Sequence, residues 1–490
     1  MKTIFISSVL LLLSFCVNAQ NSESITIGKK EIISSKILNE NRKIWIYTPN
    51  ITSQSVSPDK RYPVLYLLDG DAHFFSTVGI IQQLSQANGN SLLPEMIVVA
   101  IENTNRFRDF GPSADLNKTN PFIDFLSSEL IPYIDKNFNT APYKLLVGHS
   151  LGGLTAINIL TKFPELFNAF IAIDPSMWYD NENFLKNTIA QFPKLNMTNK
   201  RLFIGTANTM PKGMTISQLK KDNSIETQHI RSIFKLDKFL KANTNGLRYD
   251  QKYYETERHN TTPLISEYDG LRFIFDYYNL DATEKDFADS TPLIASKLKT
   301  HYANVSEKMG YKNSAPEAFI NYFAYDALGK KQYNKAEALF KLNIEWYPKS
   351  HNVYDSYADY FLAKEDTTNA ITNYKKALQI ETNDITQRKL DALVTKETPI
   401  IPANIDLHKY VGVYVLETYN IPIILEIRDD KLWAKVQGQE DDEFKWLSEN
   451  VFTVKGKQGY TIIFQIDNNK PKGFTSVQPN GTFHATFKNK

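Results

Sequence analysis

The stretch Lys144-Leu145-Leu146-Val147-Gly148-His149-Ser150-Leu151-Gly152-Gly153 joins an apolar strand to a Gly-x-Ser-x-Gly motif, and a helical pattern follows it. In such a motif the serine lies on a sharp strand-to-helix turn, and Gly148 and Gly152 leave room for that turn. Ser150 then projects its hydroxyl above the sheet, which predicts a nucleophile. The backbone N–H of Leu151 would form one half of an oxyanion hole, because the start of a helix favours developing negative charge.

Residues 25–280 have the pattern of an α/β domain. Short apolar runs alternate with amphipathic segments, which predicts a doubly wound, mainly parallel sheet with helices on both faces. Strands covered on both faces are near-continuous apolar runs, whereas residues 42–47 alternate like an edge strand. The apolar runs are residues 64–68, 96–101, 145–147, 169–173 and 202–204.

A serine hydroxyl needs a partner that accepts its proton, since it is a weak nucleophile at neutral pH. In this order of elements the histidine follows the last core strand. His259 fits, because it lies after the strand expected over residues 248–255 and before an amphipathic helix. The second oxyanion donor is expected in the turn after residues 64–68, where we assign it to the backbone N–H of Asp71.

The acid that fixes the histidine tautomer is expected between the serine and the histidine, beyond residues 202–204. A polar stretch, residues 209–223, follows that strand and leaves more than one candidate. We favour Asp222 because it precedes the next helix, with Glu226 second and Asp174 third. If none of them orients the imidazole, the serine and the histidine act as a dyad.

Further segments of this domain match a known family. They are Tyr62 to Gly70, Asn103 to Asp109, Glu129 to Ile134, Pro175 to Trp178, and Tyr268 to Arg272. With the serine motif and His259, they make residues 30–280 resemble the putative-esterase family of α/β-hydrolases, which includes enterobactin-type siderophore esterases and carbohydrate acyl esterases. The resemblance implies an α/β-hydrolase fold and a serine carboxylic ester hydrolase that forms an acyl-enzyme. It implies no metal and no organic cofactor.

The expected substrate is a small or sugar-linked acyl ester. A siderophore trilactone is the alternative within the same chemistry. Its anionic catecholates would need cationic and aromatic groups around the pocket, and Arg106, Arg108, Trp178 and Arg258 could supply them. His73 could line the same pocket.

The charge balance and the N-terminal segment limit the classes of partner and compartment. The net charge of +2 gives no long-range field, so nucleic acid is not expected. Residues 1–19 hold an apolar run and end in a small-x-small pattern, which predicts a signal peptide cleaved after Ala19 and export to the periplasm or the medium. The run is too short for a membrane span. The single cysteine, Cys16, lies in this segment; lipid anchoring there is the alternative, although the bulky Phe15 before it argues against it.

Residues 290–397 are expected to be helical. A spacing of 34 positions relates Ala336 to Ala370 and Phe340 to Tyr374, which resembles tetratricopeptide repeats. Such repeats could bind a protein partner, but two repeats rarely form a binding surface, so a helical spacer is the alternative. An interaction protein built on this region is the rival to an enzyme. The intact serine and histidine argue against a decayed hydrolase.

Residues 404–490 follow a linker at residues 398–402 and alternate between apolar and polar positions. This pattern predicts a small antiparallel β module. Its opening, residues 407–414, resembles β-barrel-like modules at the C-termini of exported bacterial hydrolases. We expect no catalytic residue in it, because His408 and His484 have no partner at ligand spacing.

Overall fold

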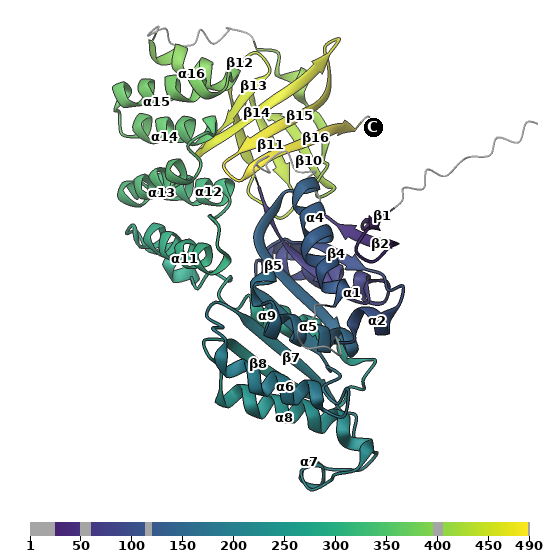
Figure 1. Ribbon diagram of the computed structural model, residues 1–490. Coiled ribbons are helices and arrows are strands. Elements are labelled where there is room, and N and C mark those ends of the chain that lie inside the picture. Colours follow the sequence, from purple (N-terminus) through teal and green to yellow (C-terminus); the bar gives the residue numbers. More distant parts are fainter. Residues whose placement is uncertain (1–24, 50–59, 113–119, 395–404, 489–490) are drawn as a thin grey trace, which may run out of the picture.

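The computed structural model describes residues 25–49, 60–112, 120–394 and 405–488 (Figure 1). An N-terminal domain of sheet and helices leads into a helical region and then into a β-barrel (Figure 1). The predicted signal peptide, Cys16 and the linker at residues 398–402 lie outside the described residues. Within the described part of the chain, no helix combines the length and the apolar character that crossing a membrane requires.

Among the described residues, eight strands form one mixed sheet in the order β1-β2-β4-β3-β5-β6-β7-β8. The pairs from β4 to β8 are all parallel, whereas β1 and β2 join one edge in antiparallel fashion. The sheet is therefore mainly parallel, as the sequence predicts. Its strands are β1 (Lys29–Ser35), β2 (Glu40–Tyr47), β3 (Tyr62–Leu67), β4 (Ile97–Ile101), β5 (Thr140–His149), β6 (Ala169–Ile173), β7 (Arg201–Ala207) and β8 (Arg248–Tyr254).

The alternating strand β2 is not an edge strand, which corrects the expectation for residues 42–47. It lies between β1 and β4, and Ile44 pairs with Glu31 on one side and Ile101 on the other. Ile44 is fully buried, while its neighbour Lys43 is exposed. The alternation therefore indicates that one face of this strand is exposed to solvent. It does not indicate that the strand lies at the edge of the sheet.

Helices cover both faces of the sheet because successive strand residues point to opposite sides. In β3, Val64 and Tyr66 belong to the core cluster shared with α5 and α8, while Leu65 and Leu67 belong to the cluster shared with α1 and α9. The helices of this domain are α1 (Gly70–Ser85), α2 (Arg106–Phe110), α3 (Pro121–Phe125), α4 (Ile131–Asn137), α5 (Leu151–Lys162), α6 (Asn183–Gln191), α7 (Ile216–Leu219), α8 (Gln228–Ala242) and α9 (Thr262–Ile274).

The region after the sheet is helical, as expected. Helices α12 and α14 begin 34 residues apart, at Glu317 and His351, and so do α13 and α15, at Tyr333 and Thr367. The predicted spacing is thus present in the helices, while the likeness to tetratricopeptide repeats stays a prediction. The helices are α10 (Glu284–Ala288), α11 (Leu293–Met309), α12 (Glu317–Gly329), α13 (Tyr333–Trp346), α14 (His351–Ala363), α15 (Thr367–Ile380) and α16 (Asp384–Val394).

The C-terminal strands close into an antiparallel barrel of eight strands within residues 405–488. Aromatic rings fill its interior, among them Tyr414, Phe452 and Phe464. The strands are β9 (Gly412–Leu416), β10 (Ile421–Arg428), β11 (Lys431–Val436), β12 (Asp442–Ser448), β13 (Val451–Val454), β14 (Lys457–Asp467), β15 (Lys470–Gln478) and β16 (Gly481–Lys488).

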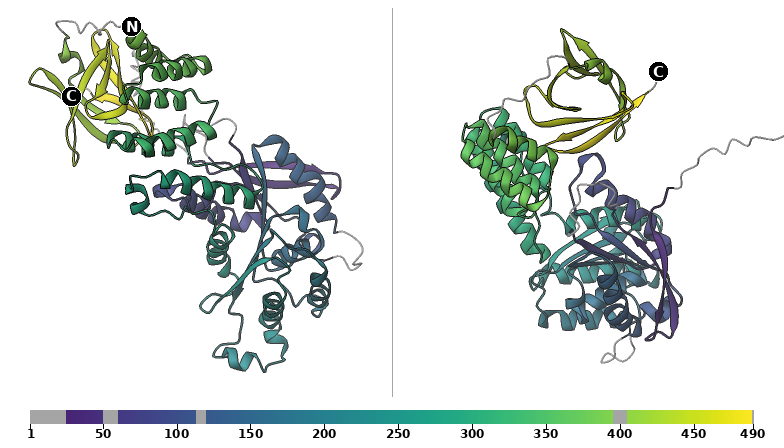
Figure 2. Two further views of the ribbon diagram at one scale, coloured as in Figure 1. Left: turned by 90° about the vertical axis from the view of Figure 1, so that its left-hand side faces the viewer. Right: turned by 90° about the horizontal axis from the view of Figure 1, so that it is seen from above.

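The barrel lies against the helical region, as both views of Figure 2 show. The side-chain amide of Asn321 in α12 donates to the carbonyl oxygen of Pro479 at 3.4 Å. Arg388 in α16 donates to the hydroxyl of Ser448 at 2.7 Å. Part of the helical surface is therefore occupied by another part of the same chain.

A mostly buried ionic cluster fastens the last helix to the rest of the helical region. The ammonium of Lys389 in α16 lies 2.6 Å from a carboxylate oxygen of Asp355 and 2.9 Å from one of Asp359, both in α14. Tyr325 from α12 donates to Asp359 at 2.6 Å, and Tyr374 from α15 also donates to it. Deleting the lysine charge would leave two neighbouring carboxylates without their cation.

We expect Lys389→Met to loosen α14 and α16 by about 2 kcal/mol, between the cost of breaking an exposed ion pair and that of breaking a fully buried one. Hydrogen exchange followed by mass spectrometry should show roughly thirty-fold faster exchange in both helices. The control is Lys299→Met, whose pair with Glu345 is more than half exposed. Equal exchange in the two variants would contradict the stabilising role of the cluster.

Candidate active site

The turn around Ser150 is as sharp as the motif predicts. Strand β5 ends one residue before it and α5 begins one residue after it. Ser150 has φ 58° and ψ −115°, a conformation that is strained for a residue with a Cβ atom. A Cβ atom at Gly148 would lie 2.3 Å from the carbonyl oxygen of Gly152, so the turn requires glycine at 148. The backbone N–H of Ser150 donates to the carbonyl of Ile173 at 2.8 Å, which ties the turn to β6.

His259 lies beside Ser150, as the sequence predicts. It sits in the loop between β8 and α9, and its Nε2 is 3.0 Å from Ser150 Oγ. The hydroxyl of Ser176, after β6, lies 3.3 Å from the same oxygen. The imidazole is 35% exposed, so a substrate can reach this side of the site.

The carboxylate that orients His259 belongs to Asp174, which was third among the candidates. Asp174 lies in the turn after β6, is fully buried, and its Oδ2 is 2.6 Å from His259 Nδ1. The backbone N–H of Ala207 donates to its other oxygen at 3.0 Å. Burial alone would raise the pKa of Asp174, but hydrogen bonds from His229 and His259 outweigh burial and lower the pKa to about 2. Asp174 is therefore a carboxylate at neutral pH.

The expectation that Asp222 fills this position is wrong. Residues 209–223 form a long connection that contains α7, which lies at the lower end of Figure 1. Asp222 serves the local turn there: its carboxylate accepts hydrogen bonds from Ser224 and Thr227. Glu226, the second candidate, is exposed. The inference failed because it assumed that the acid follows β7, whereas here it follows β6.

His229 is a member of the site that sequence reasoning missed. It lies in the first turn of α8, and its Nε2 is 2.9 Å from the same Oδ2 of Asp174 that faces His259. Its ring centroid is 5.2 Å from that of His259. The sequence held no signal for this contact beyond a histidine in a helical pattern, because the helix start and the turn after β6 are far apart along the chain.

Asp174, His229 and His259 are also a set of three groups able to bind a metal, since their ligand atoms lie within 4.8 Å of one another. Ligands around a tetrahedral Zn²⁺ stand about 3.3 Å apart, given metal–ligand bonds of about 2.0 Å. The two nitrogen-to-oxygen distances of 2.9 and 2.6 Å are shorter and match hydrogen bonds. The arrangement thus suits a hydrogen-bonded group better than a metal centre.

The two expected oxyanion donors lie at the starts of two helices. Leu151 is the first residue of α5 and Asp71 is the second of α1, so neither backbone N–H has a partner within its own helix. The preceding strands, β5 and β3, are parallel neighbours, so both helices start at the same edge of the sheet. Their role as oxyanion donors stays a prediction.

Arg106 connects the two helix starts. Its Nε lies 2.7 Å from Asp69 Oδ1, and its Nη2 lies 3.0 Å from Asp69 Oδ2 and 3.1 Å from the carbonyl oxygen of His149. The guanidinium therefore holds the turn after β3 against the serine turn. The sequence predicts that Arg106 faces the substrate. In the structure, three of its hydrogen bonds are made to other parts of the protein instead.

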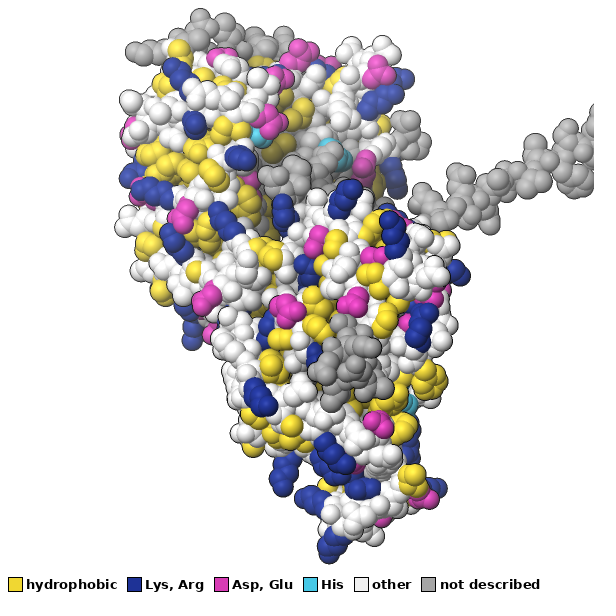
Figure 3. All heavy atoms as spheres, in the orientation of Figure 1, with side chains coloured by type: hydrophobic (Ala, Val, Ile, Leu, Met, Phe, Trp, Pro, Cys, Tyr) yellow, Lys and Arg dark blue, Asp and Glu magenta, His cyan; other side chains and the backbone are white. Residues whose placement is uncertain are grey.

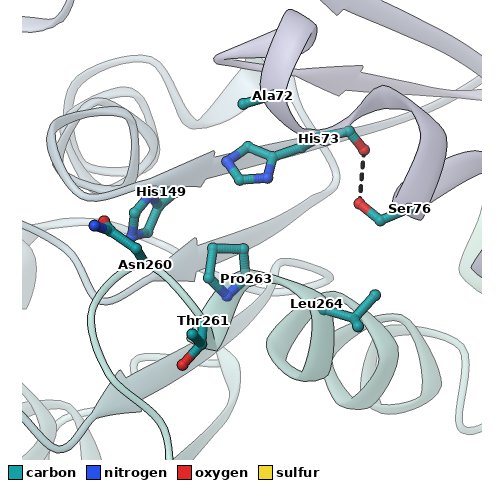
Figure 4. A pocket seen from close by; sticks show the side chains of 8 residues that line it. All are labelled: Ala72, His73, Ser76, His149, Asn260, Thr261, Pro263 and Leu264. Carbon is teal, nitrogen blue, oxygen red and sulfur yellow. Dashed lines mark hydrogen bonds between the residues drawn. The ribbon is translucent and has the colours of Figure 1, made fainter.

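Two neighbouring cavities lie at the site, and Ser150 lines the smaller one. One, of about 330 Å³, is lined by Ser150, His259, Arg106 and their neighbours. The other, of about 540 Å³, is drawn in Figure 4, where side chains from α1, the end of β5 and the start of α9 surround a common space. His73 lines both cavities, in agreement with its expected place. Trp178 is 43% exposed and lines neither of these two cavities.

Comparisons with known proteins show which proteins the sheet domain resembles. Residues 35–257 match the model of the family described as "Putative esterase". The Ferri-bacillibactin esterase BesA of Bacillus subtilis is 27% identical over 195 residues, which cover 35% of this chain and 66% of BesA. The uncharacterized protein YbbA of the same organism is 28% identical over 155 residues, which cover 29% of this chain and 59% of YbbA. The chain thus spans about three-fifths to two-thirds of these relatives.

A solved structure, an IroE-like serine hydrolase from Shewanella oneidensis, is 28% identical and has a TM-score of 0.53. The match covers 65% of this chain and 99% of that one. These similarities support an esterase domain with an α/β-hydrolase fold.

The electrostatics of the site can be tested at His149. Its ring centroid lies 4.6 Å from that of His259, and its Nε2 lies 2.8 Å from the backbone carbonyl oxygen of His259. Burial and the nearby rings of His259 and His73 lower the pKa of His149 to about 4. Because a carbonyl oxygen only accepts, the neutral ring carries its proton on Nε2 and donates it to that carbonyl.

We expect the His149 ring signals in histidine NMR, assigned by their loss in His149→Gln, to titrate near pH 4. An unfolded imidazole has a pKa of about 6.5, so protonation favours unfolding and this group lowers stability as the pH falls from about 6.5 towards 4. A midpoint near 6.5 would contradict the buried, neutral imidazole.

Proposed function

We propose that the chain is a serine carboxylic ester hydrolase that works through an acyl-enzyme on Ser150. One observation carries the proposal: a continuous chain of hydrogen bonds from Ser150 Oγ to His259 Nε2 at 3.0 Å, and from His259 Nδ1 to Asp174 at 2.6 Å. This is the arrangement that makes a serine hydroxyl nucleophilic. The likeness to an esterase family and to a serine hydrolase of known structure supports it.

In the proposed reaction, Ser150 Oγ attacks the ester carbonyl carbon while His259 Nε2 accepts its proton. The backbone N–H groups of Leu151 and Asp71 stabilise the oxyanion. The alcohol leaves with the proton that His259 returns. Water then attacks the acyl-enzyme with His259 as base, which releases the carboxylic acid. Throughout, Asp174 stabilises the imidazolium and fixes its tautomer.

Hydrolysis of siderophore esters is the second candidate. The relative BesA is a ferri-bacillibactin esterase by name, and the solved Shewanella structure is described as IroE-like. Export through residues 1–19 and partner binding by the helical region also remain proposals, and nothing in the site depends on either.

The experiment that tests the proposed function compares two carboxylates. Asp174→Asn should lower kcat for p-nitrophenyl acetate by up to about ten-thousand-fold, because an amide stabilises no imidazolium and can hold the wrong tautomer. Asp222→Asn is the matched control and should stay within a few-fold of the unaltered protein, since Asp222 contacts Ser224 and Thr227 instead. Ser150→Ala sets the background rate.

Turnover by Ser150→Ala equal to that of the unaltered protein would reject the serine mechanism. A severe loss in Asp222→Asn with little change in Asp174→Asn would reject the acid assignment. If both aspartate variants stay active while Ser150→Ala does not, the site is a Ser150–His259 dyad. Circular dichroism of each variant separates these outcomes from a failure to fold.

A further inference from the structure

The two cavities are neighbours that we treat as one groove, and Ser150 lines only the smaller of them. They share Ala72, His73, His149 and Asn260, so a bound molecule can extend from one into the other. We call the part beyond the serine the distal arm; its lining is Ala72, His73, Ser76, His149, Asn260, Thr261, Pro263 and Leu264 (Figure 4). Leu264 is 59% exposed, a large apolar side chain that a substrate would cover.

The distal arm carries no charged side chain at neutral pH among its described lining residues. Its two titratable groups are His73 and His149, and burial lowers the pKa of both. Beneath the arm, Glu267 is almost fully buried, and its carboxyl lies 3.0 Å from the hydroxyl of Thr77 and 3.3 Å from that of Ser76. Burial raises the pKa of Glu267 to about 8, so it adds little negative charge below that pH. An apolar or hydrogen-bonding group fits this arm.

The serine end of the groove is slightly acidic. Its charged lining residues are Asp69, Asp71 and Arg106. Arg106 is neutralised by its two-point contact with Asp69. Asp71 is exposed, so these three groups leave one negative charge beside the reacting ester.

The two other arginines that could have held an anion, Arg108 and Arg258, line neither cavity. Arg108 pairs with Glu40 and Asp109. Arg258 donates to the carbonyl of Asn208 at 3.1 Å. The whole molecule does not attract anions strongly, because its net charge of +2 is small and charges of both signs intermix over most of the face shown in Figure 3. The charge that a substrate meets is therefore that of the groove itself.

We propose that this groove selects esters whose bound part is uncharged and presents apolar surface, and that it discriminates against anionic esters, catecholate trilactones included. The inference rests on the proposed esterase function and specifies its substrate class. The apolar contact with Leu264 and Pro263 favours such a group, while the charge of Asp71 disfavours a second anion at close range.

The test uses the full chain and two matched pairs of esters. p-Nitrophenyl hexanoate and mono-p-nitrophenyl adipate differ in the charge of the acyl part. Phenyl acetate and 4-carboxyphenyl acetate differ in the charge of the alcohol part. Each kcat/KM is divided by the rate constant for hydroxide-catalysed hydrolysis, which removes intrinsic reactivity. We expect the neutral ester to be preferred by about tenfold in at least one pair, and less so at high salt.

A charge-reversing variant makes the test specific to the groove. Leu264→Arg should reduce the preference to about twofold or invert it, because it places a cation in the distal arm. Leu362→Arg is the matched control: Leu362 is 41% exposed on α14 and should leave the preference unchanged.

Failure of the proposed function and failure of this inference give different results. If Ser150→Ala hydrolyses the esters as fast as the unaltered protein, the proposed function fails. If hydrolysis needs Ser150 but both anionic esters react as fast as the neutral ones, or the anionic iron(III) complex of a catecholate trilactone reacts faster, the function stands and this inference is overturned.

Discussion

Asp174 accepts hydrogen bonds from three separate elements: the backbone of Ala207 at the end of β7, the imidazole of His229 in α8, and the imidazole of His259 before α9. A fully buried carboxylate is costly unless it is well partnered, so each of these contacts also stabilises the fold. The position of His259, and through it the proton of Ser150, depends on this one buried charge. The parallel strands β5, β6 and β7 bring these elements together, because they end at the same edge of the sheet.

The sequence predicted the features that depend on local patterns. The apolar runs became β3 to β7, the glycines beside Ser150 predicted its turn, and His259 followed from its position after the last strand. The acid could not be predicted in the same way. Asp174 looks like any residue after a strand, and its role depends on where two distant imidazoles lie in space. His229 was missed for the same reason, since a helical pattern does not tell which neighbour a side chain meets.

The helical region and the barrel affect the site less directly than the sheet domain does. Val305 and Met309 of α11 pack into the core cluster that α1 and α9 share with the sheet, so the helical region is anchored on the face that carries the distal arm. The barrel occupies part of the helical surface through Asn321 and Arg388. The barrel thus covers part of the surface that a repeat region would otherwise offer to a partner. Every group assigned to the chemistry lies in the sheet domain.

The proposed chemistry requires Ser150 to be an activated nucleophile. A fluorophosphonate reacts covalently with serines whose hydroxyl is activated by a neighbouring base, so intact-mass and peptide-mass spectrometry can locate that serine directly. We expect one adduct per chain, on the peptide that contains Ser150, and none on the Ser150→Ala protein. An adduct on another residue, or ester hydrolysis that persists without any adduct, would contradict it.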